Sequence, residues 1–351
     1  MSVANGHKER GAGQARKPSM REVAQHAGVA MSTVSRVIST HPDVSAGMRE
    51  RVLRSVRELG YEPDFLAQSL RRGETRSIGF AVSDISNPVI AEIEHGAEEA
   101  LRNAGYSMLV MNSENTPARD ADNIRFLQSR RVDGLILMPA GERKKAMLDV
   151  LAGLEAPIVV IDRDLPRRLR ASAVLSDHRA GVAAAVGHLL DLGHRRIGLI
   201  SWPLDVRPGR ERLAGLRDAY QARGLPDTSV HVVGFSPQDG ELATVSLLDS
   251  ADAPTALIAV TNKLLVGCLR ALVKRGVRPG HDLALVSSDD VPLTELFSPP
   301  IAIIARDNFA TGRVAAELLL RRLNGQDEPE TILLPTTFMP RASCSPPRLP
   351  S

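Results

Sequence analysis

The chain has 351 residues, more than one compact domain usually holds, so we expect a small domain joined to a larger, two-lobed one. It contains no apolar run near the ~20 residues that span a membrane, and its N-terminus carries no apolar signal segment. These features argue against a membrane or secreted protein and predict a cytoplasmic one. The two cysteines, Cys268 and Cys344, lack the spacing of a metal site, and a disulfide between them is not expected in a reducing compartment.

Positive charge is concentrated at the N-terminal end. Residues 1–72 contain twelve Lys and Arg against seven Asp and Glu, a net charge of +5, whereas the rest of the chain has a net charge of −2. A basic end of this kind is typical of a protein that binds phosphates. Residues 1–18 are rich in Gly, Ala, Arg and Lys without periodicity, which predicts a disordered basic arm.

Residues 19–38 predict two short helices joined by a tight turn at Gly28. Ser19 and Glu22 have the spacing of a capping box, which satisfies free backbone N–H groups at a helix start. After the turn, apolar residues recur at helical spacing and leave a short polar face on the other side. This pattern predicts a helix-turn-helix, whose second helix lies in the DNA major groove. An ordinary helical hairpin is the alternative for this segment alone.

Two further helices are expected before the composition changes. Residues 45–60 have Ser45 as the expected N-cap, one apolar stripe and Gly60 as the C-terminal stop. Residues 61–73 predict a short fourth helix, because a proline suits its first turn and a glycine follows its last apolar residue.

From residue 76 onward, short apolar strands alternate with helical segments such as 89–104 and 119–131. Near-continuous apolar strands separated by helices are typical of parallel sheets that are covered on both faces. Two such series follow one another, so we expect two similar α/β lobes. The strand runs are SIGFAVSD, SMLVMNSE, GLILMP and PIVVID, followed by RRIGLIS, VHVVGF, ALIAV and LALVSSD.

Motifs spread over residues 19–345 resemble the lactose/galactose repressor (LacI/GalR) family of bacterial transcription regulators. They are REVAQHAGVAMSTVSRVI, YEPDFLAQSL, SIGFAVSDISNP, LGHRRIGLI, RLAGL and SPPI. The resemblance implies an α-helical helix-turn-helix domain and an α/β two-lobed periplasmic-binding-protein-like domain with parallel sheets and three crossings between lobes.

The resemblance also implies the domain boundaries. After the basic arm we expect the helix-turn-helix domain over 19–62, a hinge helix and linker over 63–75, an effector-binding and dimerisation domain over 76–345, and a tail over 346–351. Within the large domain, the first lobe is expected at about 76–175 and 303–331, and the second at about 176–302 and 332–345.

At the DNA end, the resemblance implies that two variable side chains at the start of the second helix, Met31 and Ser32, read base edges. A thioether makes apolar contact, for example with a thymine methyl, whereas a hydroxyl bonds several bases. Arg36, one helical turn later, can reach guanine O6 and N7 with two parallel bonds. Thr33 and Ser35 are expected to bond the phosphate backbone.

One residue before this helix departs from the family pattern. Ala30 stands where the family usually has a serine cap, and the loss of that cap costs ~1 kcal/mol unless Ser32 caps a helix that starts later. The register of the two base-reading residues depends on which start is used.

The fourth helix resembles the family's hinge helix, with Ala67 and Leu70 at its minor-groove face. Leu70 matches a leucine that is inserted between base steps and kinks the duplex; the alternative is an ordinary core leucine. Asp64 stands where the family prefers asparagine, and a carboxylate near phosphates is unfavourable although it suits a helix start.

Polar side chains at the carboxyl ends of strands predict a ligand cleft between the lobes. Trp202 is the best stacking platform in a chain with few aromatic residues, and the resemblance implies that Arg212 and Asp289 contact ligand oxygens and donors. The alternative for a strand-end aspartate is a cap for the next helix. The predicted effector-binding residues are Ser83, Asp84, Val89, Ile90, Asp162, Arg163, Trp202, Arg212, Thr261, Asn262 and Asp289.

Two departures bear on this cleft. Thr261-Asn262 stands where the family has Asn-Asp, which removes a charge, and Val89-Ile90 stands where the family usually has aromatic residues. A sugar, a sugar derivative or another small polar metabolite is expected as the effector.

We therefore expect a homodimeric, sequence-specific DNA-binding regulator, a repressor, whose operator affinity is controlled by a small molecule. The chain has no P-loop and no nucleophile-elbow motif, and His188 and His194 are expected at the surface without zinc partners, so no catalytic residue, cofactor or metal is expected. The alternative from another class is a transporter's solute-binding receptor, which would need a signal peptide and would lack residues 19–73. A nucleic-acid-binding enzyme is a more distant alternative.

Overall fold

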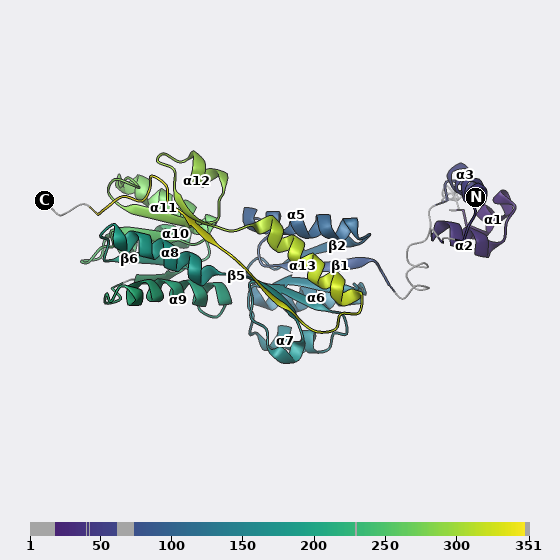
Figure 1. Cartoon of the computed structure of the whole chain (residues 1–351), viewed down its shortest axis with the longest axis horizontal. Helices are drawn as coiled ribbons and strands as arrows, with labels where there is room; N and C mark the ends of the chain where they lie inside the picture. Colours follow the sequence, from purple (N-terminus) through teal and green to yellow (C-terminus); the bar gives the residue numbers. More distant parts are fainter. Residues whose placement is uncertain (1–17, 40, 42, 62–73, 229, 348–351) are drawn as a thin grey trace, which may run out of the picture. The chain divides into compact units, whose positions relative to one another are not determined.

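The computed structural model describes residues 18–39, 41, 43–61, 74–228 and 230–347, and the chain divides into two compact units at Thr75 and Arg76. In the first unit, three helices surround a small core that includes Val23, Val34 and Val52 (Figure 1). The helices are α1 (Met20–Ala27), α2 (Met31–Ile38) and α3 (Ala46–Leu59).

The start of α1 has the predicted capping box. The Ser19 hydroxyl oxygen accepts from the Glu22 backbone N–H at 3.3 Å, and the Glu22 carboxylate accepts from the Ser19 N–H at 2.6 Å. Gly28 ends the helix in the left-handed conformation, with φ 64°, which a residue without a Cβ adopts at little cost. The predicted turn between α1 and α2 therefore has the expected geometry.

The recognition helix α2 begins at Met31. Ala30 is its N-cap residue and supplies no side-chain cap bond, so the helix does not start later with Ser32 as its cap. Ser45 occupies the N-cap position of α3, but the capping bond expected from its side chain is absent. The predicted hinge helix, with Asp64, Ala67 and Leu70, lies outside the described residues.

The first lobe of the second unit is built on a six-stranded parallel sheet. Helices α5 (Pro88–Asn103) and α13 (Asn308–Leu323) cover one face, and α6 (Pro117–Ser129) and α7 (Lys145–Ala152) cover the other (Figure 1). The strand order is β11 (Thr331–Leu334), β5 (Ser172–Ser176), β4 (Ile158–Ile161), β3 (Gly134–Met138), β1 (Ser77–Val82) and β2 (Ser107–Asn112).

The second lobe repeats this plan, with one antiparallel strand at the edge of its sheet. The helices α8 (His178–Asp191) with α9 (Arg207–Ala222), and α10 (Pro237–Leu248) with α11 (Asn262–Arg275), pack in pairs against it. The strand order is β12 (Thr337–Met339), β10 (Ala302–Ala305), β9 (Ala284–Ser288), β8 (Ala256–Ala259), β6 (Ile197–Ser201) and β7 (Val230–Val233).

The chain crosses between the lobes after β5, after β10 and after β11. The last two crossings come a few residues later than the expected boundaries at 303 and 332, because β10 pairs with β9 in the second sheet and β11 pairs with β5 in the first. The first and third crossings lie side by side: the Thr336 hydroxyl donates to the Asp177 carbonyl at 2.8 Å, and the Asp177 N–H donates to the Leu334 carbonyl at 2.9 Å.

His194 corrects an expectation drawn from the sequence. It is buried, not at the surface, with Nδ1 2.8 Å from the Thr255 hydroxyl and Nε2 2.8 Å from the Ser345 carbonyl.

None of the helices that the structure describes combines the length and apolarity needed to cross a bilayer.

Helices α5 and α13 approach each other closely through two glycines. A Cβ on Gly96 would lie 2.0 Å from the Phe309 carbonyl oxygen, and one on Gly312 would lie 1.8 Å from the Ile93 carbonyl oxygen. Both contacts are with backbone, so they are relieved only if the helices move apart.

Gly312→Ala is therefore expected to destabilise the first lobe, because overpacking of this kind costs about 1–3 kcal/mol. Thermal unfolding followed by circular dichroism should show a lower Tm than for the wild type. Gly153→Ala at the end of α7 is the control, since its Cβ would meet only the Val150 carbonyl oxygen at 3.7 Å. Equal Tm values for the two variants would contradict the close approach.

Candidate functional site

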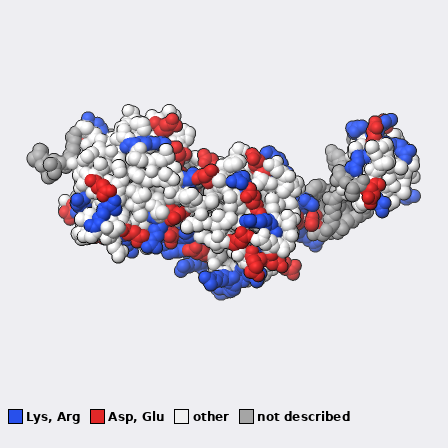
Figure 2. All heavy atoms as spheres, in the orientation of Figure 1, with Lys and Arg blue, Asp and Glu red and all other residues white. Residues whose placement is uncertain are grey.

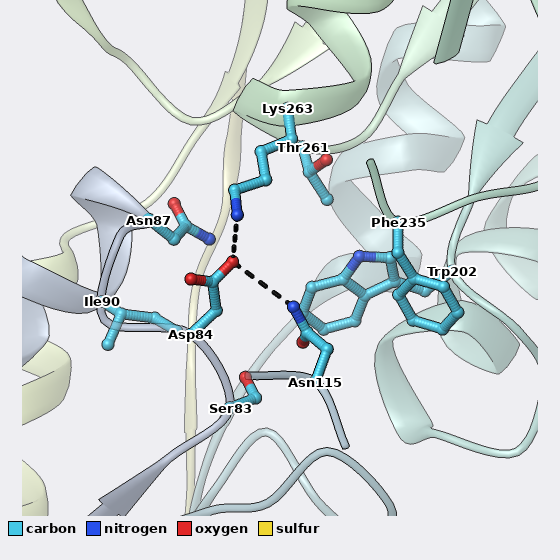
Figure 3. A pocket seen from close by; sticks show the side chains of 9 residues that line it. All are labelled: Ser83, Asp84, Asn87, Ile90, Asn115, Trp202, Phe235, Thr261 and Lys263. Atoms are coloured by element: carbon cyan, nitrogen blue, oxygen red, sulfur yellow. Dashed lines mark hydrogen bonds and ion pairs between the residues drawn. The ribbon is translucent and has the colours of Figure 1, made fainter. Parts of the chain in front are cut away.

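A narrow recess lies between the two lobes. Its lining comes from both of them, and the polar side chains converge on its centre (Figure 3). The first lobe contributes Ser83, Asp84, Asn87, Ile90 and Asn115, and the second lobe contributes Trp202, Phe235, Thr261 and Lys263.

Asp84 occupies the centre of this recess and joins the lobes. Its carboxylate forms an ion pair with Lys263 of the second lobe and accepts from Asn115 at 3.3 Å and from the Ser86 hydroxyl at 2.6 Å. Burial alone would raise the pKa of Asp84, but the hydrogen bonds from Lys263 and Ser86 outweigh it and lower that pKa. Asp84 is therefore a charged carboxylate held by a cation from the opposite lobe.

A second contact between the lobes lies beside the first. The Asn262 amide donates to the Asn87 side-chain oxygen at 3.3 Å, and that same oxygen caps α5 by accepting from the Val89 N–H. Oδ1 of Asn262 is buried and has no hydrogen-bond partner among the described residues. Asn262 thus joins the lobes through its amide NH₂ and keeps an unused acceptor beside the recess.

Deeper in the cleft, Arg306 bridges two carboxylates from different lobes. Its guanidinium contacts Asp162, at the end of β4, at 2.7 Å and Asp289, at the end of β9, at 2.6 Å. Burial alone would lower the pKa of Arg306, but the two carboxylates raise it above its ordinary value. Both aspartates have a left-handed backbone, with φ 50° and 68°, which is uncommon for residues other than glycine and clusters at functional sites.

His178 completes this inner cluster, with Nε2 3.1 Å from a carboxylate oxygen of Asp162. Burial lowers the pKa of His178 to about 4, so the imidazole is neutral near pH 7. Burial alone would raise the pKa of Asp162, but His178 and Arg306 outweigh it and hold that pKa well below its ordinary range. Near pH 7 the buried cluster therefore holds two carboxylates, one guanidinium and a neutral imidazole.

Trp202 lines the recess and also contacts two buried arginines. The guanidinium carbons of Arg163 and Arg212 lie 5.6 Å and 5.7 Å from the centroid of its ring, which is cation–π distance. Arg163 belongs to the first lobe and donates to the Pro139 carbonyl at 2.7 Å, whereas Arg212 belongs to α9 of the second lobe. The indole is thus in contact with cations from both lobes.

A separate set of ion pairs joins the lobes at α9. Glu142 of the first lobe is fully buried, accepts from the Arg207 backbone N–H at 3.1 Å and pairs with Arg210 at 2.6 Å. Asp164, also of the first lobe, pairs with Arg210 at 2.6 Å. The lobes are therefore held together at α9 as well as at the recess.

The structure brings most of the predicted cleft residues together. Ser83, Asp84, Ile90, Trp202 and Thr261 line the recess, and Asn262 lies beside it. Of the remaining predictions, Asp162 and Asp289 belong to the inner cluster, and Arg163 and Arg212 lie against Trp202.

Val89 does not line the recess. It is 3% exposed and packs into the core of the first lobe, as Ile90 also does, but of the two only Ile90 also lines the recess. The sequence reasoning also omitted lining residues. Three of them come shortly after a strand, so the search of strand ends could have found them: Phe235, Asn115 and Lys263. Arg306 of the inner cluster follows β10, a strand that was not predicted.

In the first unit, the polar face of α2 is accessible. Met31 is 50% exposed, and Ser32 and Arg36 are also exposed, whereas Thr33 and Ser35 are half-buried. Val34 and Val37 on the opposite side are buried in the core. Figure 2 shows Lys and Arg side chains on the visible face of this unit, and contacts with DNA phosphates need such positive charge.

Comparison with known proteins agrees with both units. Residues 19–64 match the family model "Bacterial regulatory proteins, lacI family", and residues 186–344 match that of a periplasmic binding protein-like domain. The HTH-type transcriptional repressor PurR of Haemophilus influenzae (strain PittEE) is 32% identical over 314 residues, covering 88% of this chain and 92% of that protein. The chain belongs to the lacI family of bacterial regulatory proteins.

Further relatives extend the likeness over almost the whole length. The ribose operon repressor of Haemophilus influenzae is 32% identical, and the match covers 93% of this lacI-family chain and 98% of that repressor. A crystal structure of the lac repressor dimer bound to operator and the anti-inducer ONPF has a TM-score of 0.83 at 27% identity and covers 94% of this chain and 100% of that chain. The transcriptional regulator CelR in complex with cellobiose has a TM-score of 0.70 at 30% identity, with 93% and 100% covered.

The predicted fold class and the predicted function are thereby confirmed. This lacI-family member is a DNA-binding transcriptional repressor with an N-terminal helix-turn-helix domain and a two-lobed effector-binding domain.

Proposed function

We propose that this repressor reads its operator with Met31, Ser32 and Arg36 and fixes its position with Thr33 and Ser35. The support is the exposed face of α2, where the first two side chains stand in the opening turn and Arg36 in the last. Arg36 is the discriminating residue, because a guanidinium can donate two parallel bonds to guanine O6 and N7. Ala67 and Leu70 act at the minor groove as hinge residues, a proposal that rests on the sequence motif.

We propose that two copies of the chain bind a palindromic operator in the cytoplasm as a homodimer, without enzymatic activity. The support is the family and its solved dimer on operator. Two-fold symmetric proteins of this kind match two-fold symmetric half-sites. The coupling is reciprocal: an effector that weakens operator binding itself binds more weakly to the operator complex.

We propose that the effector occupies the recess between the lobes and is a sugar, a sugar derivative or a similar small polar metabolite. The observation that carries this is the convergence of polar side chains from both lobes around one aromatic wall, Trp202. Relatives solved with cellobiose and with ribose support a saccharide. Because the lining comes from both lobes, a bound molecule changes the free energy of lobe closure.

Trp202→Ala tests this site. The operator is first selected from random DNA with the wild type, and its binding is then followed by fluorescence anisotropy against a panel of pentoses, hexoses, disaccharides and nucleosides. We expect the variant to bind the operator within about twofold of the wild type but to need at least about fivefold more effector, since it loses about 1 kcal/mol or more of stacking and apolar contact.

Phe126→Ala is the matched control, because Phe126 is an exposed aromatic residue on α6 and does not line the recess. It should respond as the wild type does. An unchanged concentration dependence in Trp202→Ala would place the effector elsewhere.

A further inference from the structure

Lys263 reaches across the recess from the second lobe. It is the second residue of α11, and its ammonium forms an ion pair with one carboxylate oxygen of Asp84 in the first lobe (Figure 3). The same oxygen accepts from Asn115 at 3.3 Å, and the other oxygen accepts from the Ser86 hydroxyl at 2.6 Å. Of the nine described residues that line the recess, only Asp84 and Lys263 are charged. The centre of the recess therefore contains a complete ion pair that the protein itself supplies.

This ion pair takes up the space that a bound molecule needs. Between the lining side chains the recess has room for about one water molecule. Pockets that enclose a small molecule have about 300–1,000 Å³. The side chain of Lys263 points from α11 into the recess toward Asp84 (Figure 3). A sugar ring therefore does not fit while the ammonium of Lys263 holds Asp84.

The position of Lys263 is unfavourable for its own helix. It lies in the first turn of α11, directly after the helix has been capped by Thr261, whose hydroxyl oxygen accepts from the Leu264 N–H at 3.2 Å. The N-terminus of a helix carries partial positive charge and repels a cation in its first turn. Residues that oppose a local preference are expected at functional positions. In this structure the carboxylate of Asp84, from the other lobe, is what offsets the repulsion.

Lys263 can leave the recess, whereas Asp84 cannot. The side chain of Lys263 is 35% exposed, so on release it regains water and rotamer freedom. The side chain of Asp84 is 12% exposed and remains held by Ser86 and Asn115. The oxygen that Lys263 gives up can then accept from a hydroxyl or N–H of a molecule that enters.

We propose that Lys263 is an internal competitor of the effector: its ammonium closes the recess by holding Asp84, and the effector binds when it displaces this ammonium and donates to Asp84 in its place. The inference rests on the proposed effector cleft and describes how that cleft is regulated. The apparent Kd of the effector is its intrinsic Kd divided by the fraction of molecules in which the recess is open. Lys263 therefore sets the effector concentration at which the repressor responds.

The first test needs no effector. Trp202 lines the recess and is the only tryptophan in the sequence, so its fluorescence reports on access to the recess. Lys263→Met removes the ammonium but keeps a side chain of similar length, and acrylamide is a neutral quencher that does not sense the change in charge. We expect a higher Stern–Volmer constant for Lys263→Met than for the wild type.

Lys274→Met is the matched control. Lys274 lies on the same helix but pairs with Glu241 of α10, within the second lobe, so quenching should equal that of the wild type. Asp84→Asn should raise the constant as Lys263→Met does, and the double variant should raise it no further, because both residues act through one ion pair. Equal constants in the wild type and Lys263→Met, or additive effects in the double variant, would overturn the proposal.

The second test measures competition in the operator anisotropy assay. The probe is the compound of the sugar and nucleoside panel that acts on the wild type. We expect its half-effect concentration to be about two- to fivefold lower for Lys263→Met, the equivalent of the ~0.4–1 kcal/mol of an ion pair between partly exposed side chains. Lys274→Met should respond as the wild type does. An unchanged concentration would mean that nothing is displaced, and a higher one would make Lys263 a contact of the effector; either result contradicts internal competition.

Trp202→Ala separates this inference from the proposed cleft. If that variant loses the response while Lys263→Met needs as much of the compound as the wild type, the cleft is retained and the internal competitor is rejected. If Trp202→Ala responds as the wild type does, the effector lies elsewhere, and the cleft and the competition are rejected together.

Discussion

Asp162→Asn is expected to lower the stability of the effector-binding domain by about 3–5 kcal/mol, the cost of removing one partner from a buried ion pair. Asp162 is 2% exposed and accepts from Arg306, from the Ser176 N–H at 2.6 Å and from the Ser176 hydroxyl at 3.1 Å. The neutral amide leaves Arg306 with one carboxylate and turns an NH₂ group toward donors. At roughly 2 °C or more per kcal/mol, Tm should fall by at least about 6 °C.

The pH dependence of this effect has a definite sign. The pKa of Asp162 is lowered in the folded state, so its contribution is complete above the unfolded-state pKa of about 3.9 and is lost as the pH falls below it. The difference between the wild type and Asp162→Asn should therefore be constant from pH 7 to 5 and shrink below pH 4. Asp164→Asn is the control, since Asp164 is half-exposed and pairs with Arg210. If its Tm loss were as large as that of Asp162→Asn, burial of the inner cluster would not be the cause.

Arg36→Ala is expected to lower affinity for the selected operator by at least about 30-fold, because the homodimer loses one bidentate contact with guanine, worth ~1–3 kcal/mol, in each half-site. Binding to random DNA should remain nearly intact, because it depends on phosphate neutralisation. The measurement is a titration of both DNAs by fluorescence anisotropy, followed by a new selection that should show relaxed preference at one base of each half-site.

Thr33→Ala gives the contrasting pattern on the same helix. As an expected phosphate contact it should weaken operator and random DNA alike. If Arg36→Ala also produced equal losses on both DNAs, Arg36 would be a backbone contact and the base-reading role would fall to Met31 and Ser32 alone.

Much of the fold could be predicted from periodicity and caps. The helices of the first unit and eight of the strands follow from apolar spacing, because each is a local pattern with its own start and stop. Strands β5, β10, β11 and β12 were not predicted, because their place in a sheet depends on pairing with a distant partner; length is not the reason, since the predicted strands β4 and β8 have only four residues each. The lobe boundaries differ from the expected ones for the same reason, because the pairing of β10 and β11 determines which lobe each strand belongs to.

The residues of the candidate site were likewise predicted only in part. Strand-end positions led to Asp84, Asp162, Thr261 and Asp289, because the carboxyl ends of parallel strands meet at one edge. Lys263 and Arg306 were missed because their role depends on long side chains that reach a carboxylate across the lobes, a property of the closed arrangement and not of any local pattern. Val89 and Ile90 both pack into the core of the first lobe, and no signal in the sequence showed that only Ile90 would also line the recess.

The three crossings between the lobes restrict how the effector-binding domain can move. The first and third are joined by the bonds of Asp177 with Thr336 and Leu334, and the second carries Arg306, whose guanidinium contacts both lobes. Because the three crossings connect the lobes at one place, the lobes cannot separate as independent bodies. We therefore expect the cleft to open by rotation about the crossings. The contacts at Lys263 and Arg210 then break together when the cleft opens.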